Sequence, residues 1–421
     1  MSGLIVDRQQ PNSSTKQDFL IGRQPIFDRQ LRVIGYELLF RSLTGSISDM
    51  SGDLATTHVI LNAFSEIGLQ NLVGDGLAFI NCTRSFLTGK LPFPLPASRS
   101  VLEVLEDITI DKQLVDSLNR FAHSGYTIAL DDVVSFQHVE PLLGLARVVK
   151  IDLPKTRHDD LPELVREFKA YGTIMLAEKV ETQKEYEYCK RCGFDYFQGY
   201  FFSKPAVIRG SKVDQSRMVV LHALSILQDP NCNFQMLEDV ISRDVSLSYK
   251  LLKLVNSAYY AQNRLINSIS QTVGVIGITQ LSGWLTLMLM NAVDNKPHEL
   301  TRTAMMRAKL CELLGKRLGA RDTNMLFMVG LFSVLDALFD TTMQQVLTSL
   351  SIAPEVEAGL LRREGEGGFV LSLVEAIERG DWELVLQAKI PADLIRSSYL
   401  QALDWTNQII ISTEKALQAA E

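Results

Sequence analysis

The chain divides near residue 206 into two halves with different patterns of hydrophobic positions. In the first half, short runs of apolar and β-branched residues alternate with segments of helical length. This alternation predicts parallel βα units, and about eight of them favour a closed α/β barrel of the TIM type. The predicted strands are FLIGRQPIF, VIGYELLF, LAFINCT, VLEVLE, YTIALDD, VVKIDL, TIMLAEKV and YFQGYFF.

The second half loses the strand pattern and keeps helical spacing to the C-terminus. In SLSYKLLKLVNSAYY, Leu247, Leu251 and Val255 recur on one face of a helix. We therefore predict an α/β barrel followed by an all-α domain. The expected boundaries are a polar tail at 1–17, the barrel at 18–205, a linker at 206–212, the helical domain at 213–405 and a C-terminal helix or tail at 406–421.

Composition agrees with two soluble domains. A chain of 421 residues is longer than one core usually grows, and 46% hydrophobic with 22% charged residues is typical of globular proteins. The net charge of -7 argues against a nucleic-acid-binding surface. No signal peptide is visible, and the most apolar stretch, 283–293, is shorter than the roughly 20 residues that span a bilayer. We expect a cytoplasmic protein that does not contact membranes.

Two short segments resemble metal sites but have simpler interpretations. The five cysteines include one CKRC, at Cys189 and Cys192, which lacks the second pair that a zinc site needs, so we expect reduced structural thiols. The His-Asp pair in RHDD, at 157–160, has no other histidine close in sequence and is expected to be a polar loop or helix start.

Polar side chains recur where the predicted strands of the barrel end. The carboxyl ends of barrel strands converge on one mouth, so these side chains should form a single site. Any one of them alone would be explained by solvation or a salt bridge, but surface acids do not explain recurrence across six strands. They are Glu37, Asn81, Glu103, Glu106, Asp131, Asp132, Lys150, Asp152, Glu178 and Glu181.

The adjacent acids Asp131 and Asp132 indicate the chemistry of this site. Neighbouring carboxylates repel each other unless they are solvated or neutralised by a cation. Carboxylate and amide oxygens suit Mg²⁺ or Mn²⁺, and an aspartate pair can hold two ions about 3.5 to 4 Å apart. Two such ions align the attacking and leaving oxygens of a phosphoryl group, and Lys150 would orient the water or balance phosphate charge. The pattern favours metal-assisted phosphodiester hydrolysis.

The first domain resembles the EAL domains, which bind and linearise cyclic di-GMP. YELLFR is similar to their signature in the form Glu37, Leu39 and Arg41, with Leu38 in place of alanine. Seven further motifs occur in the family's order: RQPIF, FIN, LEVLE, LDD, VKID, AEKVE and FQGYFFSKP.

This resemblance implies cyclic di-GMP as the ligand, two divalent ions, Mg²⁺ or Mn²⁺, as cofactors, and a set of site residues. The ligands of one ion would be Glu37, Asn81, Glu103 and Asp131, with Asp132 shared with the second ion. The catalytic set would be Lys150 near the attacking water, with Glu178 or Glu181 completing the site. The nucleotide-binding set would be Gln24, Leu39, Arg41 and Gln198, of which Arg41 would bind a phosphate.

Two departures from the family's pattern affect the mouth. Active relatives follow the aspartate pair with Phe-Gly, whereas Val133 and Val134 stand here, and β-branched residues lack the freedom of glycine to adopt a positive φ. We therefore expect the loop after Asp132 to be displaced. Lys179 replaces the glycine expected in AEKVE and adds bulk and positive charge.

The helical half resembles the HDOD module, a relative of metal-dependent HD phosphohydrolases that lacks their ligands. The motifs are DVSLSYKLLKLVNSAYY, SISQTVGVIGITQLSGWL, GLFSVLDALF and LVEAIERGDW. Ser333 and Val334 occupy the position of a His-Asp pair, and only His222 and His298 occur in this half, so we expect no catalysis here. The methionines of this half should either fill the core or form an adaptable protein-binding surface: Met288, Met290, Met305 and Met306.

Two classes of function remain open. The chain is either a cyclic di-GMP phosphodiesterase, weakened by the altered loop, or a non-catalytic effector. In the effector, the barrel binds the nucleotide or only keeps its shape, and the helical domain contacts a protein partner. A homodimer is expected as an option in either case. The intact acids and Lys150 favour the enzyme, whereas DDVV favours the effector.

Overall fold

The structure is a computed structural model. It describes residues 19–42, 68–89, 93, 95–203, 215–227, 234–242, 247–248, 251–252, 255, 269–277, 281–283, 285, 297–348 and 352–418. The predicted tail at 1–17, the linker at 206–212, and Met288 and Met290 lie outside these residues, as does the side chain of Arg41.

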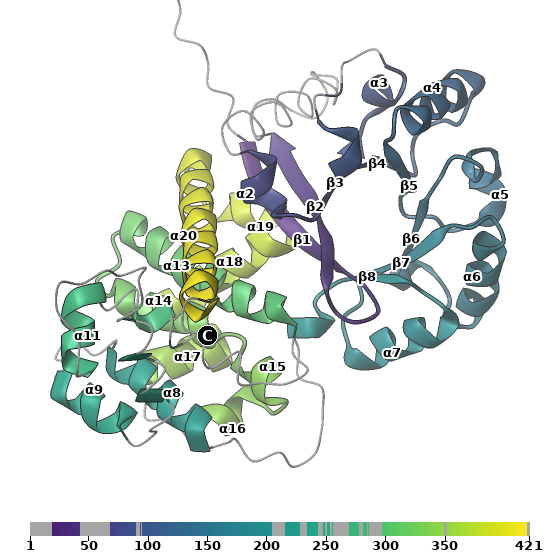
Figure 1. Ribbon diagram of the computed structural model, residues 1–421. Coiled ribbons are helices and arrows are strands. Elements are labelled where there is room, and N and C mark those ends of the chain that lie inside the picture. The colour runs from purple at the N-terminus through teal and green to yellow at the C-terminus, as the bar shows by residue number, and fades with distance from the viewer. Residues whose placement is uncertain are drawn as a thin grey trace, which may run out of the picture.

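Eight strands close into a barrel in sequence order, which confirms the predicted α/β fold of the first half (Figure 1). Strands β2 to β8 are parallel, whereas β1 is antiparallel to both β2 and β8. The expectation of uniformly parallel βα units is therefore wrong for β1. The strands are β1 (Phe19–Phe27), β2 (Val33–Ser42), β3 (Leu77–Cys82), β4 (Ser100–Val104), β5 (Thr127–Leu130), β6 (Val148–Asp152), β7 (Ile174–Glu178) and β8 (Tyr196–Gln198).

A tight turn at residues 28–32 explains the reversal between β1 and β2. The Asp28 carboxylate accepts hydrogen bonds from the backbone N–H groups of Gln30 and Arg32 at 2.8 and 2.9 Å, and Leu31 takes a positive φ of 60°. Aspartate favours such turns because its short side chain bonds to the backbone two residues on. The connection is too short for a helix, so the chain must turn back as a hairpin.

Helices lie outside the barrel, and apolar side chains fill its lower interior. The amphipathic helix α4 is capped at its N-terminus by Asp111, whose carboxylate accepts a hydrogen bond from the N–H of Leu114 at 2.9 Å. Inside the barrel, a layer formed by Ile26, Phe79, Val101, Ala129, Val148 and Leu176 closes the space below the carboxyl ends of the strands. The helices are α2 (Leu69–Val73), α3 (Arg84–Leu87), α4 (Lys112–His123), α5 (Phe136–Val139), α6 (Leu161–Lys169) and α7 (Gln183–Cys192).

The regular secondary structure in the described residues of the second half is helical, as predicted. Its core is formed largely by α13, α14, α18 and α20, which pack on one another. None of the described helices is both long and apolar enough to span a bilayer. The helices are α8 (Gln215–Leu227), α9 (Phe234–Ile241), α11 (Ile269–Ile276), α13 (His298–Leu318), α14 (Thr323–Phe332), α15 (Leu335–Phe339), α16 (Met343–Thr348), α17 (Pro354–Arg362), α18 (Gly365–Arg379), α19 (Trp382–Gln387) and α20 (Ala392–Gln418).

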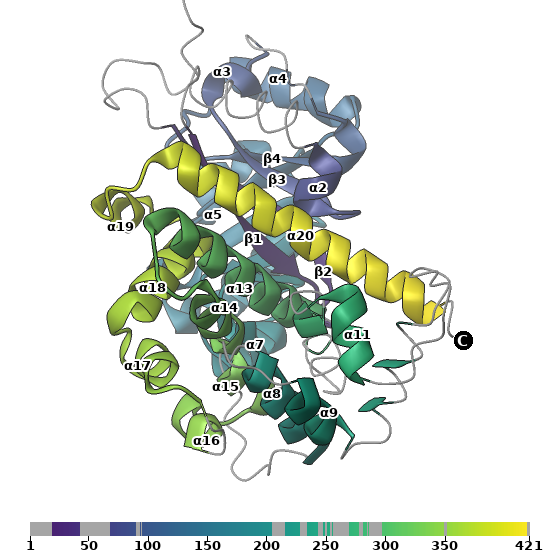
Figure 2. The same cartoon turned by 90° about the vertical axis from the view of Figure 1, so that its left-hand side faces the viewer.

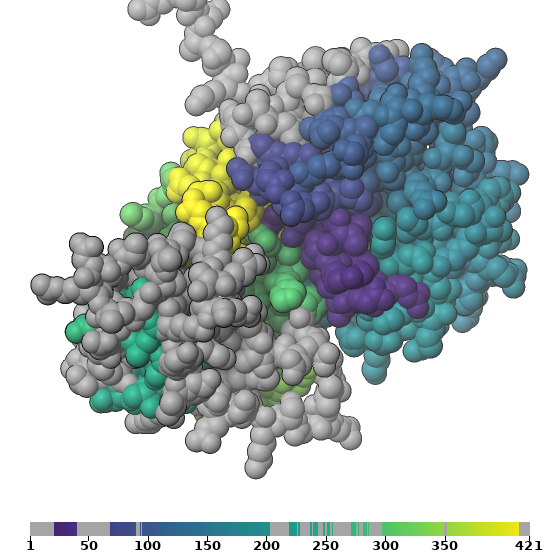
Figure 3. Space-filling model, in the orientation of Figure 1, coloured from purple at the N-terminus to yellow at the C-terminus, as the bar shows by residue number. Residues whose placement is uncertain are grey.

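The two halves pack directly against each other. Helices α18 and α20 contact β1, and Figure 2 shows α20 crossing from the helical half over the barrel strands. The Asn407 side chain of α20 donates a hydrogen bond to the carbonyl of Asn71 at 3.1 Å. In Figure 3 the purple β1–β2 segment lies between the C-terminal helices and the rest of the barrel. One continuous hydrophobic cluster therefore includes residues from both halves.

Several smaller predictions can be checked directly. His158–Asp160 form a 3₁₀ turn before α6, on an exposed stretch, which confirms the polar interpretation of RHDD. The described cysteines, Cys82, Cys189, Cys192 and Cys311, are free thiols. Met305 and Met306 are buried, so these two methionines fill the core rather than form an accessible contact surface.

Candidate functional site

Four carboxylates surround the ammonium group of Lys150 at the carboxyl ends of the barrel strands. Lys150 projects from β6 and is completely buried. The distances from its Nζ are 2.7 Å to Glu103 on β4, 2.8 Å to Asp131 after β5, 3.0 Å to Glu178 on β7 and 3.4 Å to Glu37 on β2. Residues widely separated in sequence thus meet because parallel strands end at one mouth.

Amide side chains fix the position of the Glu37 carboxylate. Asn81 Nδ2 donates to Glu37 Oε1 at 2.9 Å, and Gln198 Nε2 donates to Glu37 Oε2 at 2.6 Å. Gln198 Nε2 also contacts Gln24 Oε1 at 2.8 Å. Strands β1, β2, β3 and β8 therefore contribute one connected network to the mouth.

Burial and charge act against each other in this cluster. Burial raises the pKa of Glu178 to about 8, and burial raises the pKa of Glu103 and of Asp131 although Lys150 opposes the shift. Burial also acts to raise the pKa of Glu37, but Lys150, Gln198 and Asn81 outweigh it, so this pKa is lowered. Burial alone would lower the pKa of Lys150, yet the surrounding carboxylates raise it well above its usual range. One ammonium cannot neutralise four carboxylates, so without a further cation the cluster retains protons on some of its acids.

The donor set fits divalent cations. Within the described part of the chain, buried oxygens without a hydrogen-bond partner include Asn81 Oδ1, Glu103 Oε2, Glu178 Oε2 and Gln198 Oε1. Carboxylate oxygens of Asp131, Asp132 and Glu178 also lie within 4.8 Å of one another. Unpartnered oxygens of this kind are the ligands that Mg²⁺ and Mn²⁺ take. The residues present therefore fit a divalent cation.

Two lysines add positive charge at the rim of the mouth. Lys155 Nζ lies 2.6 Å from Asp132 Oδ2, and Asp132 has a positive φ of 46°. Lys179 also takes a positive φ, 55°, and its ammonium pairs with the buried carboxylate of Asp152. A left-handed conformation costs a non-glycine residue about 1 to 2 kcal/mol, which is why glycine is expected at this position. The pairing with Asp152 offsets part of that cost.

The two valines of the altered loop do not occupy left-handed positions. Positive φ occurs at Asp132, whereas neither Val133 nor Val134 has a positive φ. Val133 is buried, and its N–H donates to the Lys150 carbonyl at 3.0 Å, while Val134 is 59% exposed. The chain therefore leaves β5 without needing glycine at either valine.

Other predicted site residues lie at different depths. Glu181 and Glu106 are exposed outside the Lys150 cluster, and the Glu181 N–H donates to Glu185 at the start of α7. Leu39 is half-buried on β2. Lys155 was not predicted from the sequence. The feature of the sequence that could have indicated its position is Pro154 in KIDLPK. Proline favours the first turn of a helix, and here the short 3₁₀ turn Leu153–Lys155 is capped by the Asp152 side chain.

Comparisons with known proteins identify both halves. A model of the EAL domain matches residues 85–205, and a model of the HDOD domain matches 215–351. YuxH, an uncharacterized protein of Bacillus subtilis (strain 168), is 32% identical over 402 residues, or 93% of this chain and 98% of YuxH. The chain belongs to the family of EAL–HDOD proteins. Its EAL barrel begins upstream of the matched segment, because β1, β2 and β3 precede residue 85.

Two further similarities concern the EAL–HDOD chain and its EAL domain. Cyclic di-GMP phosphodiesterase CdgJ of Vibrio cholerae serotype O1 is 32% identical over 412 residues, covering 96% of this chain and 95% of that protein. The crystal structure of an EAL domain protein from Listeria monocytogenes EGD-e is 21% identical and has a TM-score of 0.36. That match covers 44% of this chain and 87% of the Listeria chain.

Inside the HDOD domain, structural contacts occupy the position of the missing His-Asp pair. Val334 is buried, and Ser333 Oγ donates to the Gly330 carbonyl at 2.7 Å and accepts from Arg307 at 3.1 Å. Arg307 is buried and pairs with Glu378 at 2.7 Å. Of the two histidines, His222 is exposed and His298 begins α13.

Proposed function

We propose that this EAL–HDOD protein hydrolyses cyclic di-GMP to linear pGpG at the acidic mouth of its barrel, with two Mg²⁺ or Mn²⁺ ions. The observation that carries the proposal is the convergence of four carboxylates on Lys150, three of them buried and that of Asp131 partly exposed. The similarity to a phosphodiesterase from Vibrio cholerae over nearly the whole chain supports the same substrate.

Each residue at the mouth then has a role. Glu37, Asn81, Glu103 and Asp131 would hold one ion, and Asp131, Asp132 and Glu178 the other, whereas the exposed Glu181 would hold neither. Such ions neutralise phosphate charge and lower the pKa of a bound water, which makes it a nucleophile.

Lys150 and the nucleotide-binding residues would act without accepting protons. Because the pKa of Lys150 is raised, its ammonium stabilises negative charge on the phosphate rather than serving as a general base. Gln24 and Gln198 would orient the nucleotide beside Glu37, and Leu39 would contact it. Arg41 would donate to a phosphate through its planar guanidinium group.

The test is hydrolysis by purified protein with cyclic di-GMP and Mn²⁺, measured as linear product by chromatography. Asp131→Asn should reduce turnover by at least about 100-fold, because it removes ligand charge without changing volume. The matched control is Asp116→Asn, at an exposed position on α4, which should keep the wild-type rate. Wild-type turnover in Asp131→Asn would reject the metal assignment.

A second candidate is a nucleotide-binding effector without turnover. The observation that favours it is the pairing of Asp132 with Lys155, since this ammonium competes with a metal ion for the same carboxylate. In this case, calorimetry would detect cyclic di-GMP binding while no linear product forms. The HDOD domain would then pass the signal to a protein partner, and native mass measurement would test the expected homodimer.

A further inference from the structure

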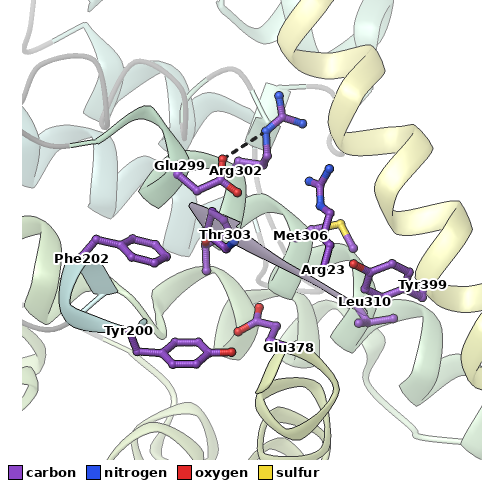
Figure 4. A pocket seen from close by; sticks show the side chains of 11 residues that line it. Arg23, Tyr200, Phe202, Glu299, Arg302, Thr303, Met306, Leu310, Glu378 and Tyr399 are labelled. Carbon is purple, nitrogen blue, oxygen red and sulfur yellow. Dashed lines mark ion pairs between the residues drawn. The ribbon is translucent and has the colours of Figure 1, made fainter. Parts of the chain in front are cut away.

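The EAL and HDOD domains meet through a polar cluster that is buried between them (Figure 4). The Tyr36 hydroxyl on β2 donates to Glu299 Oε2 at the start of α13, at 2.8 Å. Arg23 on β1 lies over the Tyr36 ring, with 4.3 Å between the guanidinium carbon and the ring centroid. Arg302 pairs with Glu299 at 3.6 Å, the dashed contact in Figure 4.

A small cavity accompanies this cluster. Its volume is about 40 Å³, and its polar lining includes Arg23, Glu299 and Arg302 of the cluster together with Glu378 and Tyr399. This volume holds about three water molecules, far less than a nucleotide needs. The lining also carries both signs of charge, so it is not selective for one class of ion. The cavity is therefore a small gap in the contact between the domains rather than a ligand site.

The alternation of side chains along β1 and β2 links this contact to the acidic mouth. Successive residues of a strand point to opposite faces of the sheet. Arg23 and Tyr36 point outward to the HDOD domain, whereas the next residues, Gln24 and Glu37, point into the barrel and join the Gln198 network. One peptide unit thus separates each interdomain contact from a residue of the proposed site.

The HDOD domain also contacts the β1–β2 ribbon at a second place, where Gly22 on β1 pairs with Leu39 on β2. A Cβ atom added to Gly22 would lie 2.8 Å from the Ile377 carbonyl oxygen and 3.4 Å from the Trp382 ring. A Cβ atom added to Gly380 would lie 3.0 Å from the Leu39 side chain. The turn between α18 and α19 therefore packs closely against the strand pair that carries Leu39.

We propose that the HDOD domain is a positioning element of the barrel site, with Tyr36 and Glu299 as positioning residues that hold Glu37 in place for metal binding. Signals received by the HDOD domain would then change metal affinity and turnover through the β1–β2 ribbon. The effect on turnover rests on the proposed function, whereas the effect on the conformational stability of β1 and β2 does not.

Hydrogen exchange and Mn²⁺ binding test this proposal on the full chain. Tyr36→Phe removes only the hydroxyl that Glu299 accepts. We expect faster amide exchange in β1 and β2 but unchanged exchange in β6 and β7. We also expect Mn²⁺ affinity, measured by calorimetry, to weaken about fivefold or more, with kcat falling more than KM changes. Because coupling is reciprocal, Mn²⁺ added to the wild type should slow exchange in the first turn of α13.

Glu312→Gln provides the matched control. It breaks the Lys309–Glu312 pair at 2.8 Å on the same helix, away from the cluster, and should change neither exchange in β2 nor Mn²⁺ affinity. If Tyr36→Phe does not fold, Glu299→Gln replaces it in the same measurements, because glutamine keeps the shape of the side chain. Unchanged β1–β2 exchange in both folded variants overturns the proposal. Absence of hydrolysis in the wild type overturns the proposed function instead. The exchange measurement still tests whether Tyr36 and Glu299 position the β1–β2 ribbon.

Discussion

Lys155 places a cation at the mouth beside Asp132, where it competes with a metal ion for the same carboxylate. Its ammonium lies 2.6 Å from Asp132, and its side chain is half-exposed. Lys155→Met should tighten Mn²⁺ binding by about two- to fivefold, since exposed ion pairs are typically worth up to about 1 kcal/mol. Calorimetric titration measures this change. Lys112→Met, at an exposed position on α4, is the control, and equal affinities in all three proteins would remove Lys155 from the site.

The raised pKa of Glu178 predicts how the metal-free protein responds to pH. This pKa is about 8, against an ordinary value of 4.5. Between these values the folded state keeps a proton that the unfolded chain has lost, so the free energy of unfolding falls as pH rises through this window. Glu178→Gln should flatten part of the slope, while Glu103 and Asp131 retain the rest. Tm measured in EDTA across the window checks this, and an equal slope in the variant contradicts it.

The sequence located the acids because each lies within or directly after an apolar strand, and parallel strands bring their carboxyl ends together. It did not locate Lys155 as the partner of Asp132, and it left Glu178 and Glu181 as alternatives. The contact of Lys155 with Asp132 depends on a 3₁₀ turn, and the choice of Glu178 over Glu181 for the cluster depends on where β7 ends. Such local differences of one turn leave no clear periodic signal.

Among the elements, β1 determines how the domains are joined. Its hairpin direction was not predicted, because periodicity identifies a strand but not its partner. Arg23 on β1 and Tyr36 on the neighbouring strand β2 point outward and carry polar groups. A pattern of hydrophobic positions therefore does not predict that they are buried. Their burial depends on helices that lie more than 250 residues further along the chain.

Gly22 provides a test of the packing of β1 on α18. Gly22→Ala places a methyl group 2.8 Å from the Ile377 carbonyl oxygen, and backbone cannot move aside as a flexible side chain does. Overpacking of this kind should lower the free energy of unfolding by about 1 to 3 kcal/mol. Gly144→Ala is the matched control, since no heavy atom lies within 4 Å of its added Cβ. Denaturant unfolding measures both, and equal stability would show that the interface yields easily.

At the scale of the whole molecule, domain order and class followed from the pattern of the chain, whereas the relation between the domains did not. The change from alternating strands to helices near residue 206 distinguishes an α/β domain from an all-α one. Nothing periodic in either half reveals that one hydrophobic cluster includes both. Contacts of this kind couple positions far apart in sequence, so they require the structure.

The shared packing of β1, α18 and α20 has a consequence for how such genes recombine. A crossover between two homologous genes near residue 206 would join a β1–β2 ribbon to helices that evolved against another ribbon. The outward residues of the β1–β2 hairpin would then pack against helices whose charges and side-chain volumes do not match them. This would occur even if each half folds stably in the protein from which it came. YuxH and CdgJ align with this chain over 98% and 95% of their lengths. We expect the two halves of this lineage to descend together and substitutions at Arg23, Tyr36 and Glu299 to be correlated.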